Sequence, residues 1–143
     1  MKAIQISPAV YFDKRGFVFD IVDTIDTQQR EVGQPGTQRA LVCVRCGAYV
    51  THPEARISVS GRHTHEFTNP YGVAFLIGCF MDAPGIAEQG EGTDFWSWFP
   101  GYWWQIGLCG GCQWHLGWRF SNGSDVFYGL MLNRLLENDV KAQ

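Results

Sequence analysis

The sequence predicts an all-β domain of antiparallel sheets that a bound metal ion holds together. One observation is that short β-rich apolar runs recur along the chain, while its 17 glycines and 6 prolines interrupt any helical period. The other is a pair of Cys-x-x-Cys motifs, at residues 43–46 and 109–112. A chain of 143 residues is long enough to bury one compact core.

The two Cys-x-x-Cys motifs predict a closed four-cysteine zinc site. They stand 62 residues apart, and two thiolates with two residues between them fit two corners of a tetrahedron. Four ligands, Cys43, Cys46, Cys109 and Cys112, leave no open coordination position, so the expected Zn²⁺ is structural rather than catalytic. Two disulfides are the alternative, and a rubredoxin-type iron site would use the same four ligands.

The predicted strands are short β-rich apolar runs, and turn residues bound the later ones. The run at residues 103–109 leads into the second cysteine motif, and Asn122-Gly123-Ser124 forms a turn between two later runs. Only residues 130–137 suggest a helical turn or two. The predicted strands are residues 40–43, 57–59, 73–80, 103–109, 114–120 and 126–132.

The first 39 residues are predicted to form an N-terminal arm, and residues 40–143 the domain itself. Within the arm, β-rich runs at residues 10–12 and 17–22 with a turn between them predict a hairpin. The polar stretch that follows contains Gly33-Gln34-Pro35-Gly36 and indicates a linker. The hairpin could cover the domain or mediate self-association.

The charge balance argues against nucleic acid and membrane surfaces as partners. The 11 basic and 14 acidic residues give a formal charge of −3, without the basic stripe that a phosphate backbone requires. No apolar run reaches the length of a signal peptide core or a membrane span. We therefore expect a soluble, cytoplasmic protein, in a compartment that keeps zinc-binding thiols reduced.

All six tryptophans fall between Trp96 and Trp118, around the second cysteine motif. Residues two apart share a face of a strand, so Trp118 and Phe120 should line one surface. Trp104 on the preceding strand and Trp98 in the loop before it could complete a box of indoles. The alternative is that these are core tryptophans of a small zinc fold.

A box of indoles has two common uses. One is to hold a quaternary ammonium by cation–π attraction, usually with an acidic residue nearby. The other is to clasp a small, flat, neutral ring while main-chain groups read its polar edge. Only Asp94 is close in sequence to the box, which favours the neutral ring over a methylated ammonium.

Four motifs closely resemble the thalidomide-binding (CULT) domain family of cereblon. Residues 98–104 read WFPGYWW, and residues 109–120 read CGGCQWHLGWRF, with the zinc spacing of that family. Residues 68–72, TNPYG, resemble its Asn-Pro-x-Gly segment, and residues 127–130, FYGL, resemble its Phe-Trp-Gly-Leu segment. The resemblance covers roughly the stretch from Leu41 to Leu136 and is that of a stand-alone, bacterial-type member.

The resemblance implies a β-tent, in which zinc pins two antiparallel sheets together near their apex. It also implies a three-tryptophan cage that binds cyclic imides, such as glutarimide or succinimide rings and thalidomide-type ligands. The cage would consist of Trp98, Trp104 and Trp118, with Phe120 at its base.

Further site residues follow from the same resemblance. Asn69, followed by Pro70, would approach the part of the ligand that lies outside the cage. Main-chain groups from Trp96 through Ser97 to Trp98 would pair with the imide N–H and a carbonyl; the position of Trp96 is a histidine in the animal protein. The expected partner is a small cyclic imide or a peptide that ends in one. No ubiquitin ligase interface is evident in this chain.

We expect no enzymatic activity. His63 and His65 form a His-x-His motif, but in a polar loop such histidines are more often surface residues. The enzymatic alternative is a zinc-containing methionine sulfoxide reductase, which has a similar sheet scaffold and needs an accessible low-pKa cysteine as nucleophile. No cysteine follows Cys112, and Cys79 lies in the apolar run 73–80, where a buried inert thiol is expected.

Overall fold

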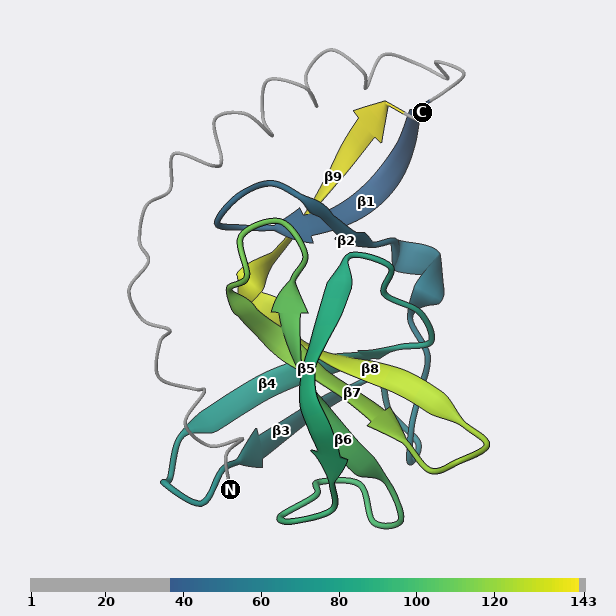
Figure 1. Cartoon of the computed structure of the whole chain (residues 1–143). Coiled ribbons are helices and arrows are strands. Elements are labelled where there is room, and N and C mark those ends of the chain that lie inside the picture. The colour runs from purple at the N-terminus through teal and green to yellow at the C-terminus, as the bar shows by residue number, and fades with distance from the viewer. Residues whose placement is uncertain (1–36, 142–143) are drawn as a thin grey trace.

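The computed structural model describes residues 37–141, which form nine β-strands and two short 3-10 helices (Figure 1). The strands are β1 (Thr37–Cys43), β2 (Tyr49–Thr51), β3 (Thr64–Thr68), β4 (Ala74–Phe80), β5 (Ile86–Thr93), β6 (Trp103–Cys109), β7 (His115–Ser121), β8 (Val126–Met131) and β9 (Leu135–Lys141). The 3-10 helices are η2 (Pro53–Ala55) and η3 (Leu132–Arg134). Across this part of the chain, no helix is long and apolar enough to cross a membrane.

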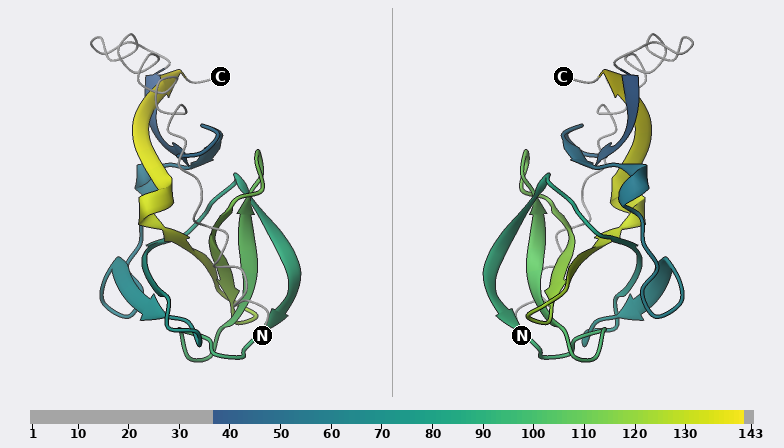
Figure 2. Two further views of the ribbon diagram at one scale, coloured as in Figure 1. Left: turned by 90° about the vertical axis from the view of Figure 1, so that its left-hand side faces the viewer. Right: turned by 90° about the vertical axis from the view of Figure 1, so that its right-hand side faces the viewer.

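The strands form two antiparallel sheets, so the predicted all-β fold class is confirmed. The smaller sheet has the order β2-β1-β9, and the larger one the order β3-β4-β8-β7-β6-β5. The chain passes from the larger to the smaller sheet at η3, between β8 and β9. Figure 2 shows the larger sheet strongly curved, with β5 and β6 on one side, β3 on the other, and the smaller sheet beyond one end.

The register between β6 and β7 decides which side chains share a face. Trp104 lies opposite Phe120, and Ile106 lies opposite Trp118. Because side chains alternate along a strand, Trp103 projects from the other face of the same sheet. Gly117 allows β7 and β8 to approach, since a Cβ at this position would lie 2.9 Å from the Cα of Leu130.

Two large hydrophobic cores, besides a small cluster of Ala40, Val42 and Leu136, lie within the described residues. The core near the cysteines joins both sheets and includes Leu41, Val50, Phe80, Leu116 and Leu130. The second core lies within the curve of the larger sheet and includes Phe75, Ile77, Phe99, Phe120, Phe127 and Met131. The second core is largely aromatic, and Trp104 and Trp118 belong to it.

Most predicted strands are present, with small shifts at their ends. The run 103–109 is β6, and the runs 40–43, 73–80, 114–120 and 126–132 correspond to β1, β4, β7 and β8. The strand predicted at residues 57–59 is wrong, because within this segment only Val59 forms a β-bridge, an isolated one with Arg62. The helical turn predicted within residues 130–137 is only the three-residue η3.

The division into an arm at residues 1–39 and a domain at residues 40–143 stays a prediction. Strand β1 begins at Thr37, which pairs with Lys141 at the end of β9. The hairpin predicted at residues 10–22 lies outside the described residues.

Candidate functional site

The four predicted metal ligands come together where the two sheets meet. Their Sγ atoms all lie within 4.8 Å of one another. Cys43 and Cys112 are 3.8 Å apart, and Cys46 and Cys109 are 3.6 Å apart. Four sulfurs at about 2.3 Å from a central zinc ion would be about 3.8 Å apart. The sulfur spacing therefore fits a tetrahedral metal site, and all four cysteines are free of disulfides.

The backbone around the cysteines supports a thiolate. The N–H groups of Gly111 and Cys112 point at the Sγ of Cys109, at 3.3 and 3.5 Å. A hydrogen bond from the Cys43 thiol, and then these two N–H groups, lower the pKa of Cys109 below its ordinary value. A side chain at Gly111 would crowd the site, because its Cβ would lie 3.2 Å from the Sγ of Cys46. The residues present thus suit a metal that thiolates bind.

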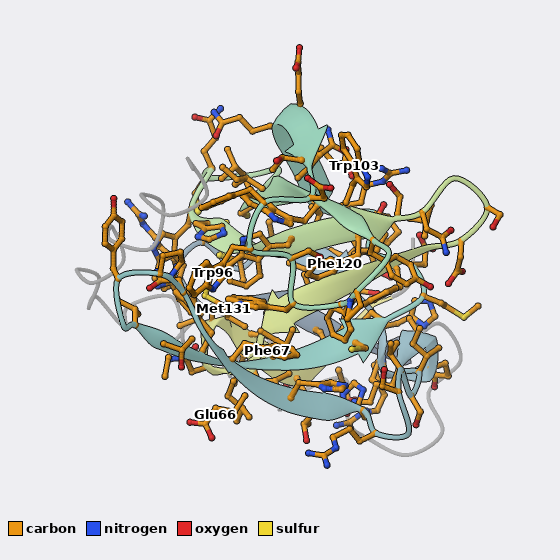
Figure 3. The ribbon with its side chains drawn as sticks, turned by 90° about the horizontal axis from the view of Figure 1, so that it is seen from below. Glu66, Phe67, Trp96, Trp103, Phe120 and Met131 are labelled. Carbon is orange, nitrogen blue, oxygen red and sulfur yellow. The ribbon has the colours of Figure 1, made fainter. Side chains whose placement is uncertain are left out.

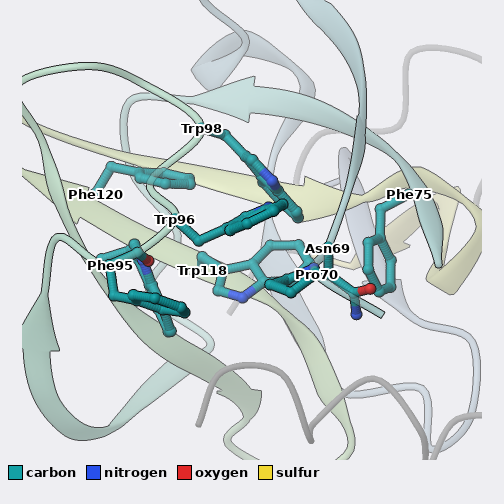
Figure 4. A pocket seen from close by; sticks show the side chains of 9 residues that line it. Asn69, Pro70, Phe75, Phe95, Trp96, Trp98, Trp118 and Phe120 are labelled. Atoms are coloured by element: carbon teal, nitrogen blue, oxygen red, sulfur yellow. The ribbon is translucent and has the colours of Figure 1, made fainter. Parts of the chain in front are cut away.

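A hollow of about 400 Å³, part of it open to solvent, lies on the inner face of β6 and β7 (Figure 4). Its inner wall consists of aromatic residues: Phe75, Trp98, Trp104, Trp118 and Phe120. Its outer part is formed by Asn69, Pro70, Phe95 and Trp96. None of these nine side chains is charged, so the hollow is a neutral apolar cage with a partly polar mouth.

The sheet fixes the inner wall. Trp104 and Trp118 are only 6% and 5% exposed, and Phe120 is 1% exposed. The ring of Trp118 packs edge-on against Trp98 at 4.8 Å and against Phe75 at 5.3 Å. The rings of Trp104, Trp118 and Phe120 are therefore held by their strands, and Trp98 is held by neighbouring rings, so the wall is formed before any ligand arrives.

The loop between β5 and β6 is tied down by three indole N–H groups. Trp104 donates to the carbonyl of Phe95 at 2.8 Å. Trp96 and Trp98 both donate to the carbonyl of Thr68, at 3.1 and 3.2 Å. The indole N–H groups are thus used to hold the loop and are not directed at a ligand.

Main-chain groups of the loop remain open for recognition. Within residues 37–141, neither the Trp96 carbonyl nor the Trp98 N–H makes a hydrogen bond. Trp96 has a φ of 57°, a left-handed conformation that costs a non-glycine residue of order 1 to 2 kcal/mol. The loop holds this strained turn directly beside one free acceptor and one free donor.

Asn69 stabilises the turn between β3 and β4 at the mouth of the cage. Its Oδ1 accepts hydrogen bonds from the backbone N–H groups of Tyr71 and Val73, both at 2.9 Å. These two bonds fix the orientation of the amide, because only the oxygen can accept. The NH₂ group of Asn69 is therefore the part of this side chain that can serve a ligand.

Two other predictions from the sequence meet different outcomes here. Cys79 is fully buried, and burial raises the pKa of its thiol to about 12, so it is an inert thiol as predicted. The polar loop predicted for the histidines is wrong, because His65 lies in β3 and is half-buried against Phe67 and Phe99. The ring nitrogens of His63 and His65 bond to backbone carbonyls, which gives both a structural role.

Sequence reasoning missed two aromatic residues of the cage, Phe75 and Phe95. Phe75 lies in β4, two residues from the buried Ile77, so strand alternation gave a signal for its inward direction. Phe95 is in the loop, and nothing in its local sequence marks it. Among the other candidate ligand-binding residues, Ser97 lies on this loop but is not part of the cage lining. The rest line the cage.

His115 is a polar residue that lies directly behind the wall of the cage. Its ring packs edge-on against Trp118 at 4.8 Å, and its Nε2 bonds to the carbonyl of Gly117 at 3.0 Å. Burial, and then the positive charge of Arg134, lower the pKa of His115 to about 3. The cage is thus backed by a neutral imidazole at physiological pH.

Comparison with known proteins finds similarity to cereblon. The chain is 28% identical to the cereblon protein of Drosophila erecta over 119 residues, which are 77% of this chain and 20% of that protein. It is 37% identical to the Drosophila persimilis protein and 36% identical to the Danio rerio protein, each over 75 residues and 49% of this chain. It spans about a fifth or less of the length of these relatives. No family model matches the chain.

Proposed function

Since this chain carries a cereblon-like domain, we propose that it is a zinc-stabilised binding module whose aromatic cage holds a cyclic imide ring. The observation that carries the proposal is the neutral cage with one free main-chain acceptor and one free donor beside it. A glutarimide or succinimide ring has flat faces for the indoles. Its polar edge offers an N–H and two carbonyls, which complement the Trp96 carbonyl and the Trp98 N–H.

The cage suits a neutral ring better than a methylated ammonium. Cation-binding aromatic cages gain much of their selectivity from a nearby negative charge, but no carboxylate lines this hollow. Asp94, the acidic residue closest to it in sequence, is exposed on the loop and is not part of the lining. A quaternary ammonium would also leave the main-chain donor and acceptor without partners.

A binding role also fits the chemistry of the described residues better than catalysis does. The enzymatic alternative needs an accessible cysteine nucleophile. Four of the cysteines belong to the metal cluster, and the fifth, Cys79, is buried with a raised pKa. The Zn²⁺ ion would have four thiolate ligands, so it would hold the two sheets together and leave no open position for a substrate.

The ligand class includes polypeptides that end in a cyclic imide. Asparagine and glutamine at a chain end can cyclise to such rings, and the peptide then leaves the cage through its mouth. The free NH₂ group of Asn69 lies there and can donate to a carbonyl of the departing chain. Ring opening to an acid would place a charge among apolar rings, which is costly without a partner.

The proposal is tested by titrating tryptophan fluorescence with glutarimide, N-methylglutarimide and trimethyllysine. We expect glutarimide to bind about tenfold or more tightly than its N-methyl form, because methylation leaves the Trp96 carbonyl unpaired. Trp104→Ala and Trp118→Ala should each cost about 2 to 4 kcal/mol of binding free energy if they behave as aromatic hot spots.

The matched control is Trp103→Ala, which removes an exposed tryptophan from the opposite face of β6. Its side chain is 52% exposed and is not part of the cage lining, so glutarimide binding should be unchanged. Equal affinity for glutarimide and its N-methyl form would contradict the pairing with the main chain. Tighter binding of trimethyllysine would identify the cage as a reader of methylated ammonium.

A further inference from the structure

The mouth of the cage carries two large aromatic side chains that the ring itself does not need. Phe95 and Trp96 are 46% and 53% exposed, whereas Trp104 and Trp118 of the inner wall are almost fully buried. Pro70 lies beside them in the lining. We call Pro70, Phe95 and Trp96 the aromatic rim. Figure 4 shows the rim residues around the same opening as Trp118.

Hydrogen bonds hold the backbone of Phe95 and the indole of Trp96 in place. The Phe95 carbonyl accepts the Trp104 indole N–H, and the Phe95 N–H donates to the Thr93 hydroxyl at 3.1 Å. The Trp96 indole donates to Thr68. The two rim rings also contact one another, with centroids 6.2 Å apart. Exposed aromatic area that is fixed in this way is pre-organised for a contact.

From these observations we propose that the rim binds an aromatic side chain on the residue that precedes a C-terminal cyclic imide. The inference rests on the proposed function, and it names the peptide class that the site would prefer. Consecutive Cα atoms are about 3.8 Å apart. When the ring occupies the cage, the preceding residue therefore lies at the mouth, and its side chain can reach the rim.

An aromatic side chain suits this rim for two reasons. Aromatic pairs gain affinity from edge-to-face or offset-stacked contacts beyond the area that they bury. The rim also carries no charge, and the exposed Asp94 directly precedes Phe95. An acidic side chain at the preceding position would gain no partner here and would meet the negative charge of Asp94.

The test uses four acetylated dipeptides whose second residue is a glutamine cyclised to glutarimide and whose first residue is Phe, Leu, Gly or Glu. Isothermal titration calorimetry gives the affinity of each. We expect the Phe peptide to bind about three- to tenfold more tightly than the Gly peptide. The Leu peptide should fall between these two, and the Glu peptide should bind no better than the Gly peptide.

Two variants locate the preference. Phe95→Ala should bring the ratio of the Phe to the Gly affinity close to one, and the coupling is read from a double-mutant cycle. Its fold can be checked by circular dichroism, since the backbone bonds of Phe95 do not need its ring. Trp103→Ala is the matched control, because Figure 3 shows Trp103 well apart from Trp96; it should keep the full ratio.

The two proposals fail in different ways. If free glutarimide binds but the four peptides have equal affinities, the cage stands and the rim preference is overturned. A Leu peptide that binds as well as the Phe peptide overturns the aromatic preference. A ratio that survives Phe95→Ala removes that residue from recognition of the preceding side chain. If neither glutarimide nor any peptide binds, the proposed function falls and this inference falls with it.

Discussion

Single side chains in this domain often have one polar atom assigned to the fold and another left for a ligand. Asn69 is the clearest case, because its oxygen is used by the turn between β3 and β4 and its NH₂ group is not. Trp98 and Trp104 follow the same division, with their indole N–H groups bonded to carbonyls and their rings left for the hollow. Substitutions that remove only one of the two polar atoms should therefore affect stability and ligand binding differently.

We predict that Asn69→Ala and Asn69→Asp have different effects. Alanine removes both hydrogen bonds to the turn, which should lower the free energy of unfolding by about 1 to 3 kcal/mol. Aspartate keeps an acceptor for the N–H groups of Tyr71 and Val73 but has no donor, so stability should change less. Urea unfolding measures the first effect.

Binding measures the second effect of these substitutions. Asn69→Asp should weaken an imide-ended peptide more than it weakens free glutarimide, because only the peptide has a carbonyl outside the cage. Equal losses for the two ligands would mean that the NH₂ group of Asn69 does not contact the departing chain. An equal loss of stability in the two variants would contradict the role given to its oxygen.

His115 predicts an acid sensitivity of the fold. Its pKa is lowered to about 3 in the folded state, against about 6.5 in an unfolded chain. Between pH 6.5 and pH 3, the unfolded state therefore binds a proton at His115 that the folded state does not bind. The contribution of His115 to stability is complete above this pH and is lost as the pH falls towards 3, at up to about 1.4 kcal/mol for each pH unit.

The measurement is chemical unfolding of the wild type and His115→Gln between pH 7 and pH 5. Glutamine can keep a donor to the Gly117 carbonyl without titrating, so the variant should show the shallower decline. Because metal release in acid also destabilises the fold, the informative quantity is the difference between the two proteins at each pH. His52→Gln, at a partly exposed histidine, is the control, and it should follow the wild type. Parallel curves for the wild type and His115→Gln would contradict the prediction.

At the scale of elements, the sequence predicts the strands that have long apolar runs and misses β2, β3, β5 and β9. The alternation and tryptophans of β6 and β7 made both strands visible. Strand β5 was missed because it is the edge of the larger sheet and is exposed at Ala87 through Glu91, so it has no apolar pattern to detect. Strand β3 was missed for a related reason, since it lies at the opposite edge and exposes every second residue.

The cage was predictable in part for a similar reason. Trp104, Trp118 and Phe120 follow from strand alternation, Trp98 follows from its place in the preceding loop, and the resemblance to a known family added Asn69. The shape of the loop from Asp94 to Phe99 was not predictable, because it depends on the carbonyl of Thr68, which is 28 residues from Trp96 in the chain. The local sequence does not indicate such a long-range contact, and the exposed aromatic rim depends on the loop shape that this contact sets.

At the scale of the whole molecule, the four cysteines connect the two sheets beside the hydrophobic core that both sheets share. Cys43 ends β1 in the smaller sheet, and Cys109 ends β6 in the larger one. The second cysteine of each motif lies in the turn that follows its strand. Trp114, after the second motif, packs beneath the guanidinium of Arg134 at 4.5 Å and that of Arg45 at 5.6 Å. A metal ion at this junction would fix the position of both cores.

We predict that the domain loses its fold when the metal is removed. Structural zinc contributes about 10 kcal/mol or more of apparent binding free energy in small sites, which is comparable with the whole stability of a domain. Chelation, or Cys109→Ser, should therefore abolish the near-UV circular dichroism signal of the tryptophans.

The control is Cys79→Ala, which removes a buried thiol outside the cluster. This variant should keep the signal and one metal ion per chain. The metal itself is identified by absorbance, since a four-thiolate zinc site is colourless and an iron site is not. A metal-free sample with an unchanged spectrum and melting temperature would contradict this account, because the packing of Leu41 and Leu116 would then be sufficient to join the two sheets.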